Sequence, residues 1–395
     1  MTKYSFLDRN VSIFSKDLIK YDDQLSDLIK GSNVLVIGAA GTIGQSVFKE
    51  IISRKPKKIF AVDISENNLV ELVRSVRSSY LNIKTEIKTF AIDAGSLEFK
   101  YFLRSYKPFD YVLNLSALKH VRSEKDPFTL MRLIKVNIFN TLNILKELDP
   151  KVLKKYFVVS TDKATNPVNM MGASKRIMEK LLFQESENFE VSLARFANVA
   201  FSDGSLLHGF NQRIQKEQPI SAPNDVERYF ISQKESGELC MLSTFLGLNR
   251  DIFFPKVEGE IELVKFSDIA ESYLNTMGFE PFECDSEEEA IKSAKKLISM
   301  KKWPCYFFKS ETTGEKDFEE FFSADSDLDL DKFATVGVIK NKSEPHDNNL
   351  NSFFKKIDNL YKNGAWSKDE LVDCFNEVLD DFSHLEKGKN LDEKM

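Results

Sequence analysis

The sequence is poor in the residues that build metal centres and disulfide-stabilised domains. Its 395 residues include four histidines and four cysteines, and Cys240, Cys284, Cys305 and Cys374 form no CxxC pair. Zinc sites and disulfide frameworks need ligands or cysteines at close, regular spacings. We therefore expect no metal site, and we expect the cysteines to be reduced thiols of a cytoplasmic protein.

Long apolar runs and an excess of basic charge are also missing. No stretch approaches the roughly 18 apolar residues that a membrane-spanning helix needs. The N-terminal stretch MTKYSFLDRNVSIFSKDLIK is too charged for a signal peptide. The net charge of −6 and the pI near 5.6 provide no basic surface for nucleic acid. The sequence thus predicts a cytoplasmic protein with no membrane span and no nucleic-acid partner.

The sequence does contain enough apolar residues for a sizeable core, at 42% hydrophobic with 33 phenylalanines. Up to about residue 160, short apolar runs alternate with segments of helical spacing. The apolar runs are NVLVIGAAG, KKIFAVDIS, EIKTFAIDA, FDYVLNLSA and KYFVVST. This alternation is typical of βαβ units, so we predict an α/β fold with a doubly wound, Rossmann-like parallel sheet.

A glycine-rich turn lies between the first predicted strand and its helix. Gly38, Gly41 and Gly44 have the spacing GxxGxxG, which lets a pyrophosphate approach the backbone at the N-terminus of a helix. Asp63 ends the second strand about 20 residues on, where a carboxylate binds the adenosine ribose and repels a 2′-phosphate. We therefore expect NAD, with NADP disfavoured. For Asp63, and for Asp93 at the end of the third strand near the adenine, the alternative is a helix cap.

The regular alternation ends near residue 200, where turn-rich stretches indicate a smaller lobe that closes over a cleft. The helix expected at 286–299, with a capping box of Ser286 and Glu289, and the strand-like WPCYFF resemble an added element. The predicted organisation is a helical lead-in at 1–31, a dinucleotide-binding domain at 32–200, a mainly substrate-binding lobe at 201–339 interleaved with it, and a linker with C-terminal helices at 340–395.

Several motifs together resemble the extended short-chain dehydrogenase/reductase superfamily and, within it, the soluble UDP-N-acetylglucosamine (UDP-GlcNAc) 4,6-dehydratases of polysaccharide biosynthesis. They are GAAGTIG (38–44), NLSALKHV (114–121), STDKATNPVNMMGASK (160–175), RFANVAFSDGS (195–205), RYF (228–230) and TTGEK (312–316). The resemblance implies cofactor contacts from Gly38, Gly41, Thr42, Ile43, Gly44, Asp63, Ser65, Asp93, Ala94, Ala117, Ser160 and Lys175.

The family pattern implies a catalytic strip made of Thr161, Asp162, Lys163, Met171 and Lys175. Asp162 is expected as acid toward the C6 oxygen and Lys163 as base at C5, with the carboxyl pKa raised and the ammonium pKa lowered by a dry site. Met171 replaces the superfamily tyrosine, as in many of these dehydratases. The acceptor of the C4 hydroxyl proton stays open between Thr161 through a water and Asp162. The alternative for Asp162 and Lys163 is a solvated surface pair.

The resemblance also implies four residues on the substrate side: Lys119, Asn198, Ser205 and Arg228. Arg228 would bind the diphosphate, and its alternative is an ion pair with Asp225 or Glu227. His120 is expected as a structural partner, and Asn137 as an organiser of the site or a buried polar contact.

Three positions depart from the family pattern. Ser116 stands at a usual alanine, Asp203 at a usual basic residue, and TTGEK lacks the usual arginine and proline. These departures leave the choice of nucleotide base open between UDP and GDP.

The sequence thus predicts a homo-oligomeric NAD-dependent dehydratase acting on UDP-GlcNAc, with GDP-GlcNAc as the alternative substrate. The oligomer, a dimer or higher, is implied by paired long helices in this superfamily. Two other functions compete: a nucleotide-sugar 4-epimerase or reductase of the same fold, and a non-catalytic protein that senses dinucleotides. The first relies on the missing tyrosine, and the second has no need of Lys163 and Lys175.

Overall fold

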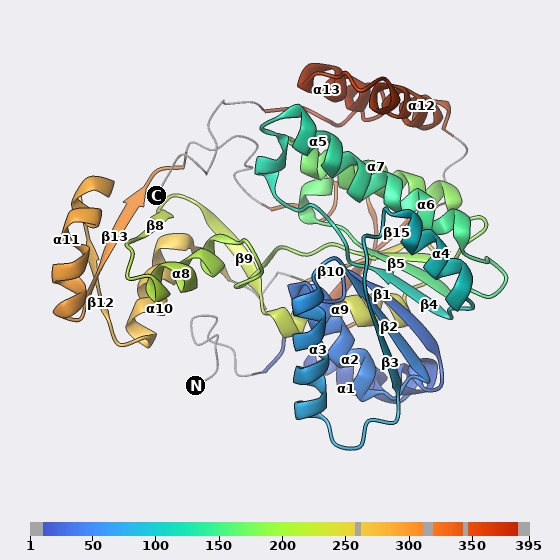
Figure 1. Ribbon diagram of the computed structural model, residues 1–395, viewed down its shortest axis with the longest axis horizontal. Coiled ribbons are helices and arrows are strands. Elements are labelled where there is room, and N and C mark those ends of the chain that lie inside the picture. Colours follow the sequence, from blue (N-terminus) through green and yellow to red (C-terminus); the bar gives the residue numbers. More distant parts are fainter. Residues whose placement is uncertain (1–10, 257–261, 311–318, 343–346, 386–395) are drawn as a thin grey trace.

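The structure is a computed structural model that describes residues 11–256, 262–310, 319–342 and 347–385 (Figure 1). Its centre is a nine-stranded sheet in the order β14-β15-β10-β6-β5-β4-β1-β2-β3. The strands are β1 (Asn33–Ile37), β2 (Lys58–Asp63), β3 (Glu86–Ala91), β4 (Tyr111–Asn114), β5 (Lys155–Val159), β6 (Val191–Ala194), β10 (Asp251–Pro255), β14 (Asp327–Asp329) and β15 (Val336–Lys340). The strands from β3 to β10 are parallel, which confirms the predicted fold class, whereas β15 and β14 pair antiparallel at one edge.

Helices cover both faces of this sheet because its strands are apolar on both sides. One face carries α1 (Ser15–Ile29), α2 (Thr42–Ser53), α3 (Glu66–Ser79) and α9 (Gln233–Leu246). The other carries α4 (Leu97–Tyr106), α5 (Pro127–Ile134), α6 (Asn140–Glu147) and α7 (Met170–Glu185). A π-helical turn, η3 (Lys135–Phe139), joins α5 to α6. Such turns are frequent at functional sites.

The N-terminal helix α1 is a packed part of the large body. The Asp17 carboxylate, with no exposed surface, accepts hydrogen bonds from the backbone N–H of Ala334 (2.7 Å) and from the N–H (2.8 Å) and hydroxyl (2.6 Å) of Thr335. A buried carboxylate with three donors fixes the helix against the segment before β15.

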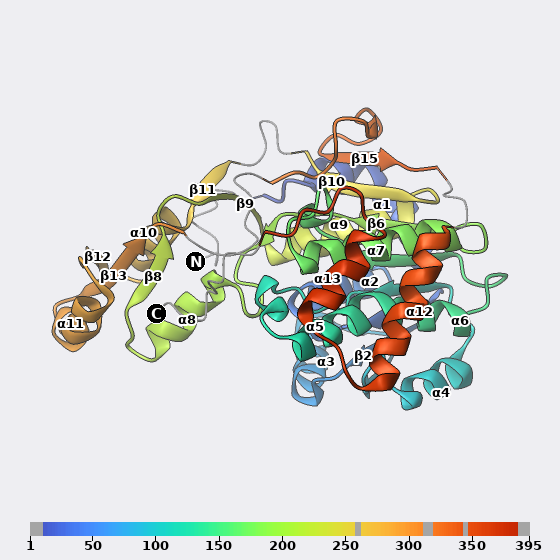
Figure 2. The ribbon, with the colours of Figure 1, turned by 90° about the horizontal axis from the view of Figure 1, so that it is seen from above.

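A smaller lobe lies at one end of the large body (Figures 1 and 2). Its parallel sheet has the order β12-β13-β8, and a second small sheet, β11-β9-β7, lies next to it. The elements are β7 (Asn198–Val199), α8 (Leu206–Gln215), β8 (Ile220–Pro223), β9 (Glu227–Ile231), β11 (Leu263–Lys265), α10 (Phe266–Thr276), β12 (Glu280–Glu283), α11 (Glu287–Ser299) and β13 (Lys302–Phe308). The interval 201–339 therefore contributes to both bodies, since α9, β10, β14 and β15 belong to the large sheet.

The stretch at 286–308 forms part of the small lobe's core, because the Trp303 side chain of β13 is buried there. The Ser286 hydroxyl caps α11 by accepting from the Glu289 N–H at 3.2 Å, as predicted. The predicted return bond of the capping box is wrong in one detail. The Glu289 carboxylate accepts from the N–H of Asp285, one residue earlier than expected, at 2.8 Å.

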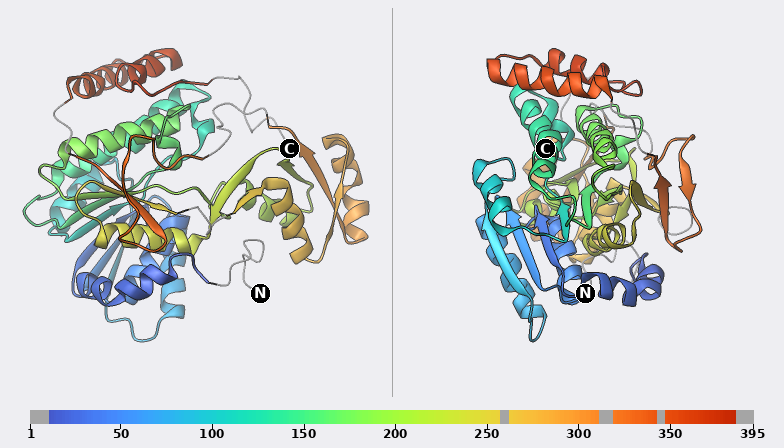
Figure 3. Two further views of the ribbon diagram at one scale, coloured as in Figure 1. Left: turned by 180° about the vertical axis from the view of Figure 1, so that it is seen from behind. Right: turned by 90° about the vertical axis from the view of Figure 1, so that its right-hand side faces the viewer.

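The C-terminal helices α12 (Asn348–Asn363) and α13 (Lys368–Asn376) form a hairpin around Gly364, which has φ +70°. The hairpin lies on the outer side of α5 and α7 (Figures 2 and 3) and buries Phe353, Ile357 and Phe375 there. The Trp366 indole N–H donates to the Pro127 carbonyl at 2.9 Å. Within the described ranges, no helix combines the length and apolar character needed to cross a bilayer.

Candidate functional site

The glycine-rich turn is shaped by two glycines and left open at the third. Gly38 has φ +76°, and a Cβ on it would lie 2.8 Å from the Ser116 nitrogen. A Cβ on Gly44 would lie 2.0 Å from the Gly38 oxygen, so α2 packs onto the turn only with glycine there. A Cβ on Gly41 would be no closer than 3.6 Å to another atom, so that position suits the approach of a ligand.

A cavity of about 230 Å³ lies above this turn at the carboxyl ends of β1, β2 and β4. Six of the residues predicted to bind the cofactor line it: Gly38, Gly41, Asp63, Asp93, Ala94 and Ala117. The Asp63 carboxylate accepts hydrogen bonds from the N–H of Ala40 (3.0 Å) and the N–H of Ser65 (2.9 Å). Neither aspartate is the helix cap that the alternative required, because Ser65 caps α3 and Ser96 caps α4.

The other residues predicted around the cofactor lie outside the lining of this cavity. Thr42, Ile43 and Gly44 form the first turn of α2, and the Thr42 hydroxyl accepts from the Asp203 N–H at 3.0 Å. The Ser160 hydroxyl instead donates to Glu179. Conversely, Arg132, Val136 and Asn140 line the cavity without having been predicted. They come from α5, η3 and α6, and a glycine motif gives no signal for them.

The predicted catalytic strip begins where β5 ends, at the carboxyl edge of the sheet. Thr161 caps a short 3₁₀ turn, η4 (Asp162–Ala164), and its hydroxyl donates to Asp162 Oδ1 at 2.6 Å. Lys163 Nζ lies 3.0 Å from Asp162 Oδ2. Asp162 is only 4% exposed, whereas the Lys163 side chain is 29% exposed. The Asp162 carboxylate is therefore buried in the protein, and the pair is not the solvated surface pair of the alternative.

A third carboxylate, Glu319, completes this cluster and was missed from the sequence. Its Oε1 accepts from Asn198 Nδ2 at 2.6 Å, and its Oε2 accepts from the Tyr229 N–H at 3.0 Å. Arg228 Nε lies 4.0 Å from Oε1. Burial, reinforced by the charge of Asp162, raises the pKa of Glu319 to about 7. Glu319 follows the TTGEK motif, whose residues 312–316 lie outside the described ranges.

The expectation of a lowered Lys163 pKa is wrong for the protein without substrate. Burial acts to lower the pKa of Lys163, but the negative charges of Asp162 and Glu319 outweigh it, so the pKa is raised. A dry site alone was expected to lower this pKa, but Asp162 is adjacent in the chain and the fold adds the charge of Glu319. The amine is therefore an ammonium ion in this arrangement.

The other two residues of the strip, Met171 and Lys175, lie on α7. Lys175 is 4% exposed, and its Nζ donates to the Val159 carbonyl at 2.9 Å. Burial lowers the pKa of Lys175 to about 8 against the opposing charge of Glu179. Met171 is 5% exposed and belongs to the apolar cluster that α5 and α7 share with the C-terminal hairpin. This apolar packing suits a thioether at the position where the superfamily has a tyrosine.

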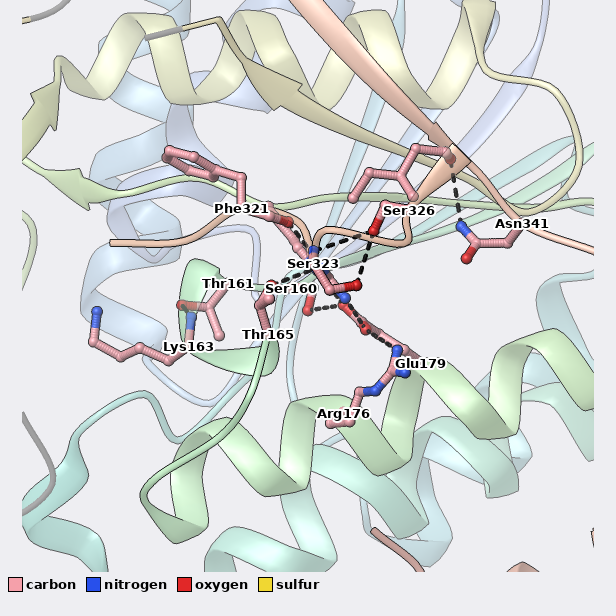
Figure 4. A network of polar contacts seen from close by, with 12 residues as sticks. Ser160, Thr161, Lys163, Thr165, Arg176, Glu179, Phe321, Ser323, Ser326 and Asn341 are labelled. Atoms are coloured by element: carbon pink, nitrogen blue, oxygen red, sulfur yellow. Dashed lines mark hydrogen bonds and ion pairs between the residues drawn. The ribbon is translucent and has the colours of Figure 1, made fainter. Parts of the chain in front are cut away.

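A buried ion pair between Glu179 and Arg195 lies next to the strip. Figure 4 labels Glu179 together with Ser160, Thr165 and Phe321. Arg195 binds Glu179 through Nε (2.8 Å) and Nη2 (2.5 Å), and Ser160 donates to the same carboxylate at 2.6 Å. Arg195 Nη1 donates to the Thr165 hydroxyl (2.9 Å) and to the Phe321 carbonyl (2.8 Å). One guanidinium thus connects β6, α7, the catalytic strip and the segment that carries Glu319.

The residues predicted on the substrate side lie where the small lobe meets the sheet edge. Arg228 is 7% exposed, and among the described residues the carboxylate within 4.0 Å of it is that of Glu319, not that of Asp225 or Glu227. Its contact with Glu227 is with the backbone carbonyl, at 2.8 Å. The Ser205 hydroxyl caps α8 by accepting from the His208 N–H at 3.2 Å.

Lys119 follows β4 and has an exposed side chain at the opening of this region. Nearby protein still desolvates its ammonium, so its pKa is lowered, with Asp203 opposing the shift. His120 packs so closely on Gly204 (φ +72°) that a Cβ there would lie 2.7 Å from its Nε2, as expected of a structural partner. The buried Asn137 amide, on η3, binds both the N–H (2.9 Å) and the carbonyl (3.0 Å) of Leu118 and so fixes this loop.

Comparison with known proteins gives the same family as the motifs. A profile of polysaccharide biosynthesis proteins matches residues 34–336. An uncharacterized membrane protein of Methanocaldococcus jannaschii is 28% identical over 75% of this chain and 87% of its own length. A UDP-N-acetylglucosamine 4,6-dehydratase (inverting) of Campylobacter jejuni is 31% identical over 58% of this chain and 68% of its own. The match to EpsC, a probable polysaccharide biosynthesis protein of Bacillus subtilis, spans only 45% of EpsC.

Solved structures share the fold. Pen from Bacillus thuringiensis has a TM-score of 0.63 at 23% identity and covers 89% of this chain and 98% of its own. The dTDP-glucose 4,6-dehydratase DesIV of Streptomyces venezuelae, solved with NAD bound, has a TM-score of 0.57 at 12% identity and covers 86% of this chain and 99% of its own. At these identities the likeness concerns the fold alone.

Proposed function

The chain belongs to the polysaccharide biosynthesis protein family of extended short-chain dehydrogenases/reductases, and from this premise we propose that it is a nucleotide-sugar 4,6-dehydratase acting on UDP-GlcNAc. One observation carries the proposal. A buried carboxylate, Asp162, contacts both an amine and a hydroxyl, those of Lys163 and Thr161, at the carboxyl end of a central strand. An epimerase needs one acid/base group at C4, whereas a dehydratase needs further groups at C5 and C6.

The cavity above the glycine-rich turn suits a nicotinamide dinucleotide. The open side of Gly41 and the N-terminus of α2 fit a pyrophosphate. Asp63 in the cavity lining favours a ribose with free hydroxyls, hence NAD over NADP. When bound, the nicotinamide supplies the redox chemistry by taking a hydride from C4 of the sugar and returning it to C6. Lys175, directly behind β5, is proposed to hold the nicotinamide ribose.

The proton transfers fall to the strip. In this proposal the C4 hydroxyl proton passes through Thr161 to Asp162, to which Thr161 already donates at 2.6 Å. This path combines the two acceptors that the sequence left open. Lys163 removes the proton at C5 and later returns it. Asp162, now protonated, gives its proton to the C6 oxygen, which leaves as water.

The substrate is proposed to lie between the strip and the small lobe. Arg228 would bind the diphosphate, and Lys119, Asn198 and Ser205 would contact the sugar and its phosphates. GDP-GlcNAc is the alternative substrate.

A homo-oligomer is also part of this proposal, but α12 and α13 cover the outer side of α5 and α7. A dimer of this protein would therefore have to form through a surface other than the outer side of α5 and α7. Light scattering during size-exclusion chromatography would measure the mass of the assembly.

Product analysis in deuterated water tests the proposal. The purified protein is incubated with UDP-GlcNAc and then with GDP-GlcNAc, and the sugar is followed by NMR. We expect a 4-keto-6-deoxy product with deuterium at C5 and no net formation of reduced cofactor. A C4 epimer would instead support the epimerase function. Unchanged sugars in both incubations would contradict an enzymatic role on these substrates.

A further inference from the structure

Resting on the proposed dehydratase function, we propose that the C-terminal segment 382–385 holds the catalytic strip in place and that His384 is a positioning residue for Lys163. This segment lies beyond residues 34–336, which match the family profile. The family motifs therefore assign it no role, and the proposal follows from its contacts alone.

Backbone hydrogen bonds attach the C-terminal segment to the loop between η4 and α7, in the middle of the catalytic strip. The Ser383 N–H donates to the Pro167 carbonyl at 3.1 Å, and the Leu385 N–H donates to the Val168 carbonyl at 3.0 Å. The Phe382 side chain, 8% exposed, belongs to the apolar cluster that α5 and α7 share with the C-terminal hairpin. The segment thus connects the hairpin of α12 and α13 to the strip.

The His384 side chain reaches a buried carboxylate at the start of α7. Its Nε2 lies 3.5 Å from Glu124 Oε2, and the same oxygen accepts a hydrogen bond from the Met170 N–H at 2.7 Å. Glu124 ends the short 3₁₀ turn η2 (Val121–Glu124), and Met170 is the first residue of α7. The side chains of His384 and Glu124 are 12% and 3% exposed. His384 therefore lies against the group that fixes the N-terminus of α7.

Two atoms of this contact are buried without a hydrogen-bond partner in the part of the chain that the structure describes: Glu124 Oε1 and His384 Nε2. Buried polar atoms are normally hydrogen-bonded, and bonds to a carboxylate are among the stronger ones. In this proposal a small shift closes the 3.5 Å gap, so that the imidazole N–H becomes a second donor to Glu124 beside the Met170 N–H.

The start of α7 in turn lies directly on the backbone of Lys163. A Cβ on Gly172 would lie 2.1 Å from the Lys163 carbonyl oxygen, so only glycine fits between the two segments. The Asn169 side chain caps the helix by accepting from the Gly172 N–H at 2.8 Å. A shift of Met170 would therefore move Gly172 and the backbone that carries the Lys163 amine. A displacement of about 1 Å at a catalytic group can lower a rate about 10²-fold.

Hydrogen exchange at the Met170 amide, followed by NMR, tests the contact without substrate. His384→Leu removes the polar nitrogen and keeps an apolar side chain. We expect the Met170 amide to exchange about 10-fold faster in this variant, which corresponds to one hydrogen bond of ordinary strength. His384→Gln places an amide N–H near Glu124 and should exchange at close to the wild-type rate.

Turnover tests whether the contact serves catalysis. In His384→Leu, kcat of the folded protein should fall by about 10-fold to 100-fold, while KM for UDP-GlcNAc stays within about twofold of wild type. KM is spared because the residues proposed to bind the substrate lie on other elements. His384→Gln should recover most of kcat. A merely structural role would lower the melting temperature without this selective and reversible loss of kcat.

A second pair of variants leaves the imidazole in place. Ser383→Pro removes the N–H that donates to the Pro167 carbonyl, at an exposed residue. It should speed exchange at Met170 and lower kcat, whereas Ser383→Ala keeps the N–H and should behave like wild type. As a further control, Lys356→Met breaks an exposed ion pair within the hairpin, with Glu377 at 2.7 Å, and should change neither quantity.

A Met170 amide that exchanges at the wild-type rate in His384→Leu would overturn the inference. An unchanged kcat in that variant, or a loss that appears in KM alone, would also overturn it. If exchange changes as expected and the wild-type protein converts neither nucleotide sugar, the hold of the C-terminal segment on the strip is supported and the dehydratase function fails. Failure of the inference and failure of the proposed function are therefore distinguishable.

Discussion

Two carboxylate–cation pairs lie near the end of β5, and they differ in what surrounds them. Glu179 and Arg195 are 0% and 4% exposed, and the hydrogen-bond donors of Arg195 meet Glu179, Thr165 and the Phe321 carbonyl. Lys163 is partly exposed and pairs with Asp162 at 3.0 Å, and the negative charge of Glu319 also acts to raise its pKa.

Both regions contain an ion pair between a carboxylate and a cation, but the Glu179–Arg195 pair suits a structural role and the Asp162–Lys163 pair suits proton transfer. A saturated pair with two parallel hydrogen bonds has no reason to exchange protons, because every alternative state leaves a buried charge unpaired. A lysine that pairs with one carboxylate while a second, which titrates near neutrality, adds its charge has several protonation states close in energy. We therefore predict that the Glu179–Arg195 pair, the inner pair, governs stability. The outer cluster, made of Asp162, Lys163 and Glu319, should govern turnover.

The largest expected effect is on turnover in Lys163→Ala. Without the base at C5, product formation should fall by about 10²–10⁴-fold. The melting temperature should stay within a few degrees of wild type, because Lys163 is partly exposed. Lys154→Ala removes a surface amine that pairs with Asp110 at 3.0 Å, and it should change neither quantity. A folded Lys163→Ala protein with full activity would refute the role of the outer cluster.

Arg195→Met should produce the largest loss of stability. It leaves the Glu179 carboxylate buried without its main partner, at an expected cost of about 3–5 kcal/mol in the free energy of unfolding. Arg176, which is 29% exposed and 3.4 Å from the same carboxylate, is the matched control. Arg176→Met should cost less than about 1 kcal/mol. If Arg195→Met and Arg176→Met lowered the free energy of unfolding equally in denaturant titrations, Arg195 would not be the main partner of Glu179.

Thr161→Val should give a smaller loss of turnover. It removes the hydroxyl that donates to Asp162 at 2.6 Å while keeping the side-chain shape. A hydrogen bond to a charged group is worth about 1.5–3 kcal/mol, so the rate should fall by about 10-fold to 150-fold. Thr161→Ser keeps a hydroxyl and should recover most of the rate. If valine and serine behave alike, the proton path from C4 does not run through this hydroxyl.

The smallest of the expected effects is on the pH dependence of stability, to which Glu319 and Glu179 should contribute in opposite directions. The raised pKa of Glu319 means that the folded protein binds more protons than the unfolded chain between about pH 4.5 and 7, so this contribution to stability is lost as pH rises through that window. For Glu179, Arg195 outweighs the effect of burial and lowers the pKa, so its contribution is lost only as the solution becomes acidic. Glu319→Gln should therefore gain stability relative to wild type between pH 5 and 8, as measured by urea unfolding. A constant difference across that range would contradict the raised pKa.

The sequence predicts those features that depend on neighbouring residues. Alternating apolar runs predict the parallel sheet, glycine spacing predicts the turn at 38–44, and adjacent residues predict the contact between Asp162 and Lys163. Glu319 was beyond reach because it meets Asn198 across 121 positions of sequence. The sign of the Lys163 pKa shift was missed for the same reason, since the second carboxylate arrives through tertiary structure. The π-helical turn at Asn137 also gives no periodic signal different from an ordinary helix.

The most direct test of the central claim is a single-turnover experiment with Lys163→Ala loaded with NAD. Absorbance at 340 nm is followed after addition of UDP-GlcNAc. If Lys163 is the base at C5, oxidation at C4 proceeds and elimination does not. The variant should then accumulate reduced cofactor without a 6-deoxy product, while wild type shows product without lasting absorbance. Normal product formation by Lys163→Ala would contradict the assignment of this residue as the base at C5.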